Sequence, residues 1–267
     1  MKKVYIHTDL EGISGIIDGN MVKVDDPGGV YCNQRLMIDV NAAIDGAFAG
    51  GADVVTVSDM HRGGGNFDLD LLDKRAEFDT KAPNPWWGKL DETYCCSFLI
   101  GTHAMAGTIG GFLEHTMDST RIYNMWINGR RAGEIALWGT ICGNFNVPLI
   151  MVSGDDAAVL EARQFLGDIE TVSVKQGINR WEARTRINND DIPDLIRESA
   201  KKVMENISEN KIKPFKPVLP VDYRIDFTRS DYCEEWLCGF KNLERIDARS
   251  VRILAGKYTD MYVWSDS

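Results

Sequence analysis

The chain has 267 residues, of which 44% are hydrophobic and 26% are charged. These proportions are ordinary for a folded globular protein and exclude extensive disorder, and the length accommodates one large domain or one large and one small. The formal net charge is −10, and the basic residues form no stripe along the chain. Because binding to a phosphate backbone requires clustered Lys and Arg, we expect no nucleic-acid partner.

The chain carries no recognisable signal for export or membrane insertion. No apolar run reaches the roughly 18 residues that a membrane helix needs, and the segment after Met1 enters a strand pattern without the features of a signal peptide. The six cysteines form no Cys-x-x-Cys pair and no disulfide framework, which is typical of reduced thiols. We therefore expect a cytoplasmic protein without a membrane partner.

Apolar periodicity predicts alternating strands and helices over most of the chain. In chain order, the pattern gives a strand at 3–8, a helix at 33–51, strands at 52–59 and 95–104, a hairpin at 121–135, a helix at 133–145, a strand at 147–154, a helix at 155–167 and a strand at 169–176. Asn128-Gly129 is the turn signal of the hairpin. Strands that are apolar throughout are expected where a parallel sheet is covered on both faces.

This order of elements predicts an α/β fold, a three-layer α/β/α arrangement with a mostly parallel sheet, and a smaller α+β unit. After about residue 180 the pattern changes to a charged helix at 190–210, a proline-rich crossing at 213–227 and a strand-like segment at 245–256. We expect residues 1–180 to form the main α/β domain and residues 181–267 a smaller C-terminal α+β portion. The pattern leaves open whether the two are interleaved.

Two carboxylates follow the first predicted strand, in the stretch VYIHTDLEGISG at 4–15. Asp9 and Glu11 are two residues apart, and side chains at this spacing in an extended segment share one face, roughly 6 to 7 Å apart. Like charges this close repel each other unless a cation lies between them. The stretch therefore indicates a metal site, which places the metal-binding and catalytic function in the predicted 1–180 domain.

Two of the four histidines, His61 and His103, stand just past the second and third predicted strands. In open α/β sheets, ligands bind outside the carboxyl ends of the strands, so three strand ends are expected to bring their side chains to one region. Glu134, at the start of the helix after the hairpin, adds a further acid. Imidazole nitrogens together with carboxylate oxygens suit zinc, or another divalent ion such as manganese.

A shared carboxylate in such a set can hold two ions about 3.5 to 4 Å apart, which is the arrangement of binuclear hydrolases. An ion pair of this kind lowers the pKa of a bridging water and polarises a carbonyl group. Hydrolysis of an amide or ester is therefore the expected chemistry.

Several segments, taken in chain order, resemble the D-aminopeptidase family of zinc metallopeptidases linked with dipeptide-transport operons. The matching segments are TDLEGISG, SDMH, IGTHA, GFLEHTM, NGRRAGEIAL, VPLIMVSGDD and VKQGINR. The resemblance runs from residue 4 to about residue 180, and the C-terminal third matches poorly.

The resemblance implies a binuclear zinc site in which Asp9 bridges the two ions and Glu11, His61, His103 and Glu134 complete the ligands. It also implies release of an N-terminal D-amino acid from short peptides or amino-acid amides. By the same analogy, the subunits would associate into a ring-like homo-oligomer, a homodecamer.

His115 matches the catalytic histidine of the family, where it would act as an acid or base or stabilise the developing oxyanion. The residues that hold the substrate are not identified by the resemblance, and Lys175 and Asn179 are candidates. Trp86 and Trp87 are interpreted equally well as a cover over the site, as a subunit contact or as a packed loop.

Two alternatives from other classes are kept. The first is a haloacid-dehalogenase-like, magnesium-dependent phosphohydrolase, suggested by the strand before Asp9 and by the acidic stretch MVSGDDAAVLEA; that mechanism needs an Asp where Glu11 stands and a lysine before the acidic stretch, whereas Lys175 follows it. The second is a non-catalytic oligomeric protein that binds metal or peptide, a function that needs no acid/base histidine such as His115. The native metal and the stereochemistry and length of the substrate stay open.

Overall fold

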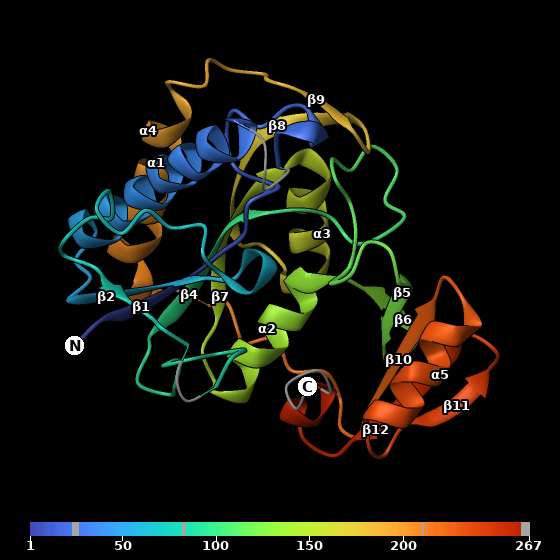
Figure 1. The fold of residues 1–267 in the computed structure, drawn as a ribbon. Coiled ribbons are helices and arrows are strands. Elements are labelled where there is room, and N and C mark those ends of the chain that lie inside the picture. Colours follow the sequence, from blue (N-terminus) through green and yellow to red (C-terminus); the bar gives the residue numbers. More distant parts are fainter. Residues whose placement is uncertain (23–26, 82–83, 210, 263–267) are drawn as a thin grey trace.

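The computed structural model describes residues 1–22, 27–81, 84–209 and 211–262, and these form two sheets (Figure 1). The first is a seven-stranded sheet in the order β3-β2-β1-β4-β7-β8-β9, parallel except for the pairing of β9 with β8. Its strands are β1 (Lys3–Thr8), β2 (Val54–Asp59), β3 (Glu77–Phe78), β4 (Cys96–Thr102), β7 (Leu149–Asp155), β8 (Glu170–Asn179) and β9 (Glu182–Arg184).

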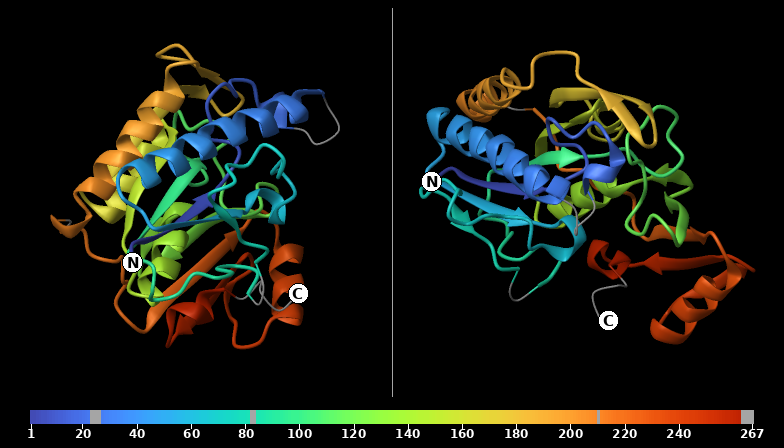
Figure 2. Two further views of the ribbon diagram at one scale, coloured as in Figure 1. Left: turned by 90° about the vertical axis from the view of Figure 1, so that its left-hand side faces the viewer. Right: turned by 45° about the horizontal axis from the view of Figure 1, so that its top comes forward.

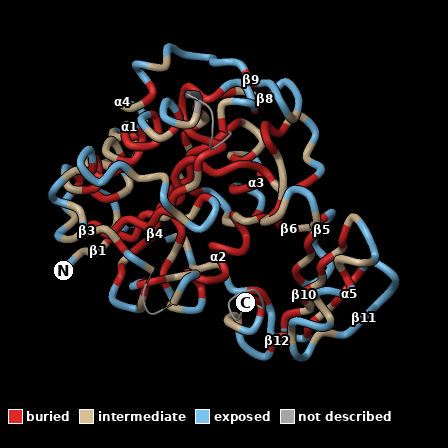
Figure 3. The backbone as a smooth tube through the Cα atoms, in the orientation of Figure 1, coloured by how far each residue is buried: buried red, intermediate tan, exposed pale blue. Residues whose placement is uncertain are grey.

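Helices cover both faces of this sheet, which confirms the predicted three-layer α/β/α arrangement (Figure 2). The helices are α1 (Pro27–Ala49) and α4 (Ile192–Glu205) on one face and α2 (Glu134–Asn144) and α3 (Asp156–Leu166) on the other. Side chains alternate along a strand, so β1 contributes Val4 and Ile6 to the core beneath α1 and α4 and Tyr5 to the core beneath α2. Buried residues follow the strands between these helix layers (Figure 3).

The second sheet is antiparallel, with five strands in the order β11-β12-β10-β5-β6. The predicted hairpin forms its β5 and β6, and the turn residues Asn128 and Gly129 take φ of 51° and 75°, the left-handed region that such turns require. The elements of this unit are β5 (Ile122–Ile127), β6 (Arg130–Ala132), β10 (Val221–Phe227), α5 (Ser230–Gly239), β11 (Glu244–Asp247) and β12 (Ser250–Ala255). Single 3₁₀ turns complete the structure: η1 (Gly19–Val22), η2 (His61–Gly63), η3 (Ile207–Glu209) and η4 (Tyr258–Met261).

Segments from both halves of the chain contribute to each sheet. The hairpin β5–β6 belongs to the first 180 residues but pairs with β10 of the C-terminal part. Helix α4 packs closely along α1, since a Cβ on Gly46 of α1 would lie 2.2 Å from the carbonyl oxygen of Arg197 in α4. The division into 1–180 and 181–267 stays a prediction, and in space the elements on its two sides are interleaved.

The C-terminal part differs from the sequence-based expectation in several details. The segment predicted as one strand at 245–256 is the hairpin β11–β12, the proline-rich crossing at 213–227 contains the strand β10, and β9 and α5 have no counterpart among the predicted elements. Helix α5 buries only Cys233, so the sequence lacks the repeating apolar positions by which a helix is recognised. None of the helices in the described ranges is both long and apolar enough to cross a membrane.

Lys175 of β8 is fully buried and ties the sheet to the segment that follows β1. Its Nζ donates hydrogen bonds to the carbonyl oxygens of Glu11, Ile13 and Ile16. Burial lowers the pKa of Lys175 to about 8, against the pull of Asp155 and Asp39 nearby. Lys175 therefore holds backbone in the interior and does not line the functional cavity described below, contrary to its suggested role as a pocket residue.

We expect Lys175→Met to lower the free energy of unfolding by about 2 to 4 kcal/mol, because it leaves buried carbonyl oxygens without a donor. Urea unfolding followed by circular dichroism measures this change. Lys202→Met is the matched control, since this exposed lysine pairs with Glu170 at the surface and its loss should cost about 0 to 1 kcal/mol. Equal effects of the two substitutions would contradict the role given to Lys175.

Candidate metal centre

The carboxyl ends of β2, β1 and β4 lie side by side because these strands are parallel neighbours. The register pairs Thr8 with Asp59 on one side and with Ile100 on the other. The residues that follow the three strands are therefore delivered to one edge of the sheet, as the sequence predicted.

Asp9, Glu11 and His61 form the first group of potential metal ligands at this edge. Nδ1 of His61 lies 3.1 Å from Oδ1 of Asp9 and 2.9 Å from Oε2 of Glu11. His61 and Glu11 are buried, so water competes little for these carboxylate and imidazole atoms.

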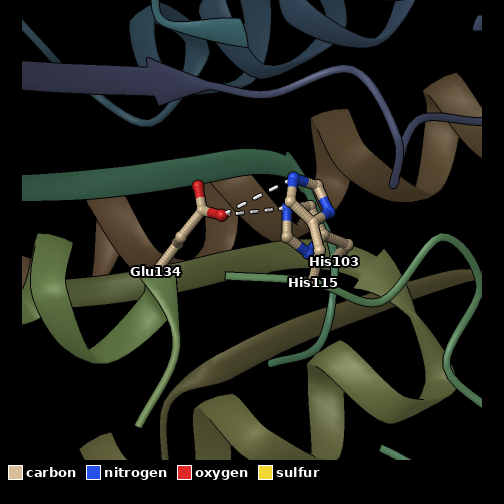
Figure 4. A group of neighbouring side chains, drawn as sticks. All are labelled: His103, His115 and Glu134. Carbon is tan, nitrogen blue, oxygen red and sulfur yellow. Dashed lines mark ion pairs between the residues drawn. The ribbon is translucent and has the colours of Figure 1, made fainter. Parts of the chain in front are cut away.

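His103, His115 and Glu134 form the second group (Figure 4). Oε1 of Glu134 lies 3.4 Å from Nε2 of His103 and 3.8 Å from Nε2 of His115, and the two imidazole rings stack with their centroids 4.0 Å apart. The same Oε1 accepts a hydrogen bond from the backbone N–H of Met117, at 2.7 Å, which fixes the carboxylate at the start of α2.

Asp9 lies between the two groups. Its Oδ1 faces His61, and its Oδ2 lies 3.3 Å from Nε2 of His103. One carboxylate thus contacts a histidine of each group, through a different oxygen in each case. The structure brings together all six residues that the sequence singled out, and their individual roles stay predictions.

The charges of the centre are strongly coupled. Burial works against the imidazolium of His61, but the carboxylates of Glu11 and Asp9 raise its pKa to about 10. Burial likewise opposes a charge on Glu11, yet His61 holds the pKa of that carboxyl well below its ordinary value. Burial is also outweighed at His103, whose pKa is raised by Glu134. The carboxylates therefore attract positive charge into this edge of the sheet.

The donor set fits a divalent ion such as zinc. Nδ1 of His103 lies 3.0 Å from the carbonyl oxygen of Ala104, which can only accept, so the neutral ring directs the Nε2 lone pair at Asp9 and Glu134. Within the described residues, Nε2 of His103 and Nε2 of His61 are buried without a hydrogen-bond partner. Imidazole nitrogens beside carboxylate oxygens are ligands that zinc accepts.

Two glycines permit this convergence. A Cβ on Gly12 would lie 1.8 Å from the carbonyl oxygen of Thr102, and a Cβ on Gly101 would lie 2.4 Å from that of Asp9. Gly101 also has φ of 81°, a conformation that side chains disfavour. Any larger residue at either position would separate the strand ends that carry Asp9 and His103.

Asp59, the last residue of β2, shapes the loop that carries His61. Its buried carboxylate accepts hydrogen bonds from the backbone N–H groups of Asn66, at 2.6 Å, and Phe67, at 3.1 Å. The Asn66 side chain donates to Asp59 and to the carbonyl oxygen of His61, at 2.7 Å. The segment 61–67, which contains three consecutive glycines, is therefore a turn closed on the Asp59 carboxylate.

Glu161 of α3 is a buried acid behind the second group that sequence reasoning missed. Its Oε2 accepts from the backbone N–H of Met105, at 2.6 Å, and a Cβ on Gly133, just before Glu134, would lie 2.8 Å from its Oε1. It thus contacts both the segment after His103 and the start of α2. Its burial could have been predicted from its position in the apolar stripe of the helix, which it shares with the buried residues Ala158, Ala162 and Phe165.

A cavity of about 750 Å³ opens onto the centre. Among the described residues, the lining comprises ligand candidates such as Asp9, Glu11, His61, His115 and Glu134, with further residues that include His7, Arg62, Lys81, Trp86, Asp118, Arg180 and Trp181. Asn179 is not part of this lining, so neither suggested pocket residue reaches the cavity.

Trp86 and Trp87, the two tryptophans of the turn at 84–88, have different surroundings. Trp86 lines the cavity and also packs against Tyr262, with ring centroids 5.8 Å apart. Trp87 packs between Phe145 and Tyr262. Trp86 thus covers one side of the site, and Trp87 belongs to the packed loop.

An α/β sheet whose strand ends gather imidazoles and carboxylates around a cavity defines a metallohydrolase type of protein. Comparison with known families is more specific, because the model of the D-aminopeptidase family matches residues 1–266. The chain belongs to the D-aminopeptidase family and is a peptidase, and the predicted resemblance is confirmed. The expectation that it ends near residue 180 was wrong, because the match includes the C-terminal third.

Two relatives illustrate the similarity. The chain is 31% identical to the D-aminopeptidase of Bacillus subtilis (strain 168) over 229 residues, which cover 83% of this chain and 81% of the relative. Its fold is similar to the solved structure of the Zn-dependent D-aminopeptidase DppA from Bacillus subtilis, described as a self-compartmentalizing protease. The TM-score is 0.90 at 27% identity, over 97% of this chain and 94% of that one.

The phosphohydrolase alternative is not favoured by these findings. Both relatives are D-aminopeptidases. In addition, the Nζ of Lys175 is taken up by three backbone carbonyl oxygens in the interior, where it cannot contact a phosphate in the cavity.

Glu161 provides a pH-dependent test of this arrangement. Burial raises the pKa of Glu161 from 4.5 to about 7, although the Met105 N–H opposes the shift. A folded-state pKa above the unfolded value means that stability is fully present below about pH 4.5 and is lost as the pH rises through about 7.

Glu161→Gln is neutral at every pH, so its stability relative to the native protein should rise by about 3 kcal/mol between pH 4.5 and pH 8. Urea unfolding of both chains in the presence of a chelator, at several pH values, measures this difference. The exposed Glu205→Gln is the control and should change stability by less than about 0.5 kcal/mol throughout. A difference that does not vary with pH would show that the Glu161 carboxyl is not buried as a neutral group.

Proposed function

We propose that this protein is a zinc-dependent aminopeptidase that releases an N-terminal D-amino acid from short peptides or amino-acid amides. The observation that carries the proposal is Asp9, whose two carboxylate oxygens face His61 at 3.1 Å and His103 at 3.3 Å. Membership in the D-aminopeptidase family and the similarity to a Zn-dependent member support it.

In this proposal Asp9 would be a ligand of both of two zinc ions. Glu11 and His61 would complete the ligands of one ion, and His103 and Glu134 those of the other. The ions would lower the pKa of a bound water and polarise the scissile carbonyl. The chain itself supplies the edge of the sheet, where these side chains follow the ends of neighbouring strands and where buried carboxylates hold the loops that carry the histidines.

His115 is the residue that we propose to move the proton or to stabilise the oxyanion. Its Nδ1 lies 2.8 Å from the carbonyl oxygen of Leu113, which can only accept, so the neutral ring has its proton on Nδ1. Its Nε2 lone pair is then free to accept a proton on the side of Glu134 and the cavity.

We further propose that the subunits form a ring-like homodecamer and act in the cytoplasm. The support for assembly is the similarity in fold to a protease described as self-compartmentalizing. Sedimentation of the purified protein measures the number of subunits, and a monomer at micromolar concentration would contradict the assembly.

The function is tested by metal analysis, chelation and add-back of zinc or manganese, followed by assay on matched D- and L-amino-acid amides and short peptides. Zinc-restored release of D-amino acids is expected. Magnesium-dependent release of phosphate from phosphate esters would favour the phosphohydrolase instead, and metal binding without turnover of any substrate would favour a binding protein.

His115→Ala should keep its zinc and lose at least about 100-fold in kcat, because general acid–base groups contribute on this scale. Metal content by atomic emission and turnover of the best substrate are measured on the same sample. Asp18→Ala, at an exposed acid near the chain's entry to η1, is the control for both measurements. Loss of zinc together with activity would make His115 a ligand instead.

Asp9→Ala should lose at least one zinc ion per subunit and all turnover, because both groups would lose a shared ligand. The metal content after dialysis against zinc-buffered solution measures the effect, again with Asp18→Ala beside it. Full zinc content in Asp9→Ala would refute the bridging role.

A further inference from the structure

We propose that Arg62 and Lys81 bind the free C-terminal carboxylate of the substrate, so that the site selects short peptides with an unblocked carboxyl end. This inference rests on the proposed aminopeptidase function and names a substrate class for it. Both side chains line the cavity that opens onto the candidate metal centre.

Arg62 directly follows His61 and is held in an unusual backbone conformation. Its φ of 50° lies in the left-handed region, which non-glycine residues adopt only where the surroundings impose it. The side chain is exposed, and it forms no hydrogen bond or ion pair with any residue in the described ranges. Its guanidinium is therefore available to a ligand, and its planar pair of N–H groups suits a carboxylate.

Lys81 lies next to the same turn. Its Nζ donates to the carbonyl oxygen of Gly63, and a Cβ on Gly64 would lie 2.9 Å from this Nζ. An ammonium group has three donors, so hydrogen bonds remain for a ligand. The backbone N–H of Lys81 donates to the buried carboxylate of Asp79, at 2.8 Å, which is itself held by the Tyr5 hydroxyl, at 2.8 Å. The position of Lys81 is thus anchored in the core.

Arg180 is the other arginine in the described lining of the cavity, but its guanidinium already forms an ion pair. Its Nη1 lies 2.9 Å from Oε1 of Glu114 and also donates to the carbonyl oxygen of that residue. Glu114 therefore already balances the charge of Arg180, although other N–H groups of its guanidinium stay open to a ligand. Within the described lining, the positive charge without an acidic partner therefore lies at Arg62 and Lys81.

Arg62 and Lys81 line the same cavity as the ligand candidates Asp9, Glu11 and Glu134. In the proposed function these acids hold zinc, so the carboxylate of a short zwitterionic peptide is the charged group that Arg62 and Lys81 can bind. The Cα atoms of His61 and Arg62 are about 3.8 Å apart, as for any consecutive residues. A carboxylate bound by Arg62 thus lies only a few residues from the scissile bond, which favours very short peptides over internal segments of long ones.

The experiment compares a D-aminoacyl-glycine dipeptide with its C-terminal amide on the zinc-loaded protein. The native chain should prefer the free acid in kcat/KM. In Arg62→Gln and in Lys81→Gln this preference should fall by about tenfold or more, which is the scale of a hydrogen bond to a charged group. Lys81→Arg keeps the positive charge and should retain most of the preference. Lys241→Gln, which removes an exposed charge between α5 and β11, should leave it unchanged.

The ratio between the two substrates separates recognition from damage to the site. A substitution that merely disturbs the His61 turn lowers both values equally, and that result, or equal use of acid and amide by the native chain, would overturn the inference. If neither substrate is hydrolysed, the proposed function fails by itself. Calorimetric binding of the same pair to the zinc-loaded protein then decides the carboxylate site, since equal affinities would reject it.

Discussion

Mutual repulsion among Asp9, Glu11 and Glu134 is the constraint around which the site is organised. Their carboxylates are brought to one edge of the sheet, where limited contact with water makes unbalanced negative charge costly. Each is placed against an imidazole, and the resulting pairs raise the pKa of His61 and His103 while lowering that of Glu11. Divalent cations offer the same compensation with fixed geometry, so the electrostatics and the proposed zinc chemistry have a single origin.

Because the carboxylates repel one another, the backbone segments that carry them must be held in place by the rest of the structure. Gly12 and Gly101 let the ends of β1 and β4 approach to backbone contact, and Lys175 binds the carbonyl oxygens of the segment after β1 from inside. Asp59 and Glu161 fix the loops that carry the histidines. These supporting groups are buried and polar, and they hold backbone rather than contacting the cavity.

The sequence predicted the elements whose signals are local. Five strands of the first sheet, the helices that cover it and the Asn128-Gly129 hairpin were predicted, because periodicity and turn chemistry specify them directly, whereas the short strands β3 and β9 were not and α1 begins at Pro27 rather than at residue 33. The convergence of Asp9, His61 and His103 followed from the general geometry of parallel sheets.

What was missed depends on contacts distant in sequence. Lys175 was suggested as a pocket residue, yet it is buried and its partners lie more than 150 positions away. Glu161 occupies an apolar stripe and is buried for that reason, but its partner, the N–H of Met105, is set by a loop whose path no local rule specifies. The hairpin β11–β12 and helix α5 lack strong apolar periodicity.

The path of the chain between the two sheets links their folding. Strand β6 ends at Ala132 in the antiparallel sheet, and α2 begins at Glu134, with Gly133 as the sole residue between them. A displacement of the second sheet would thus pull on a carboxylate of the candidate centre. A cation bound at the centre would therefore link the two sheets. With the cation bound they would unfold in one cooperative transition, and without it they could unfold in separate steps.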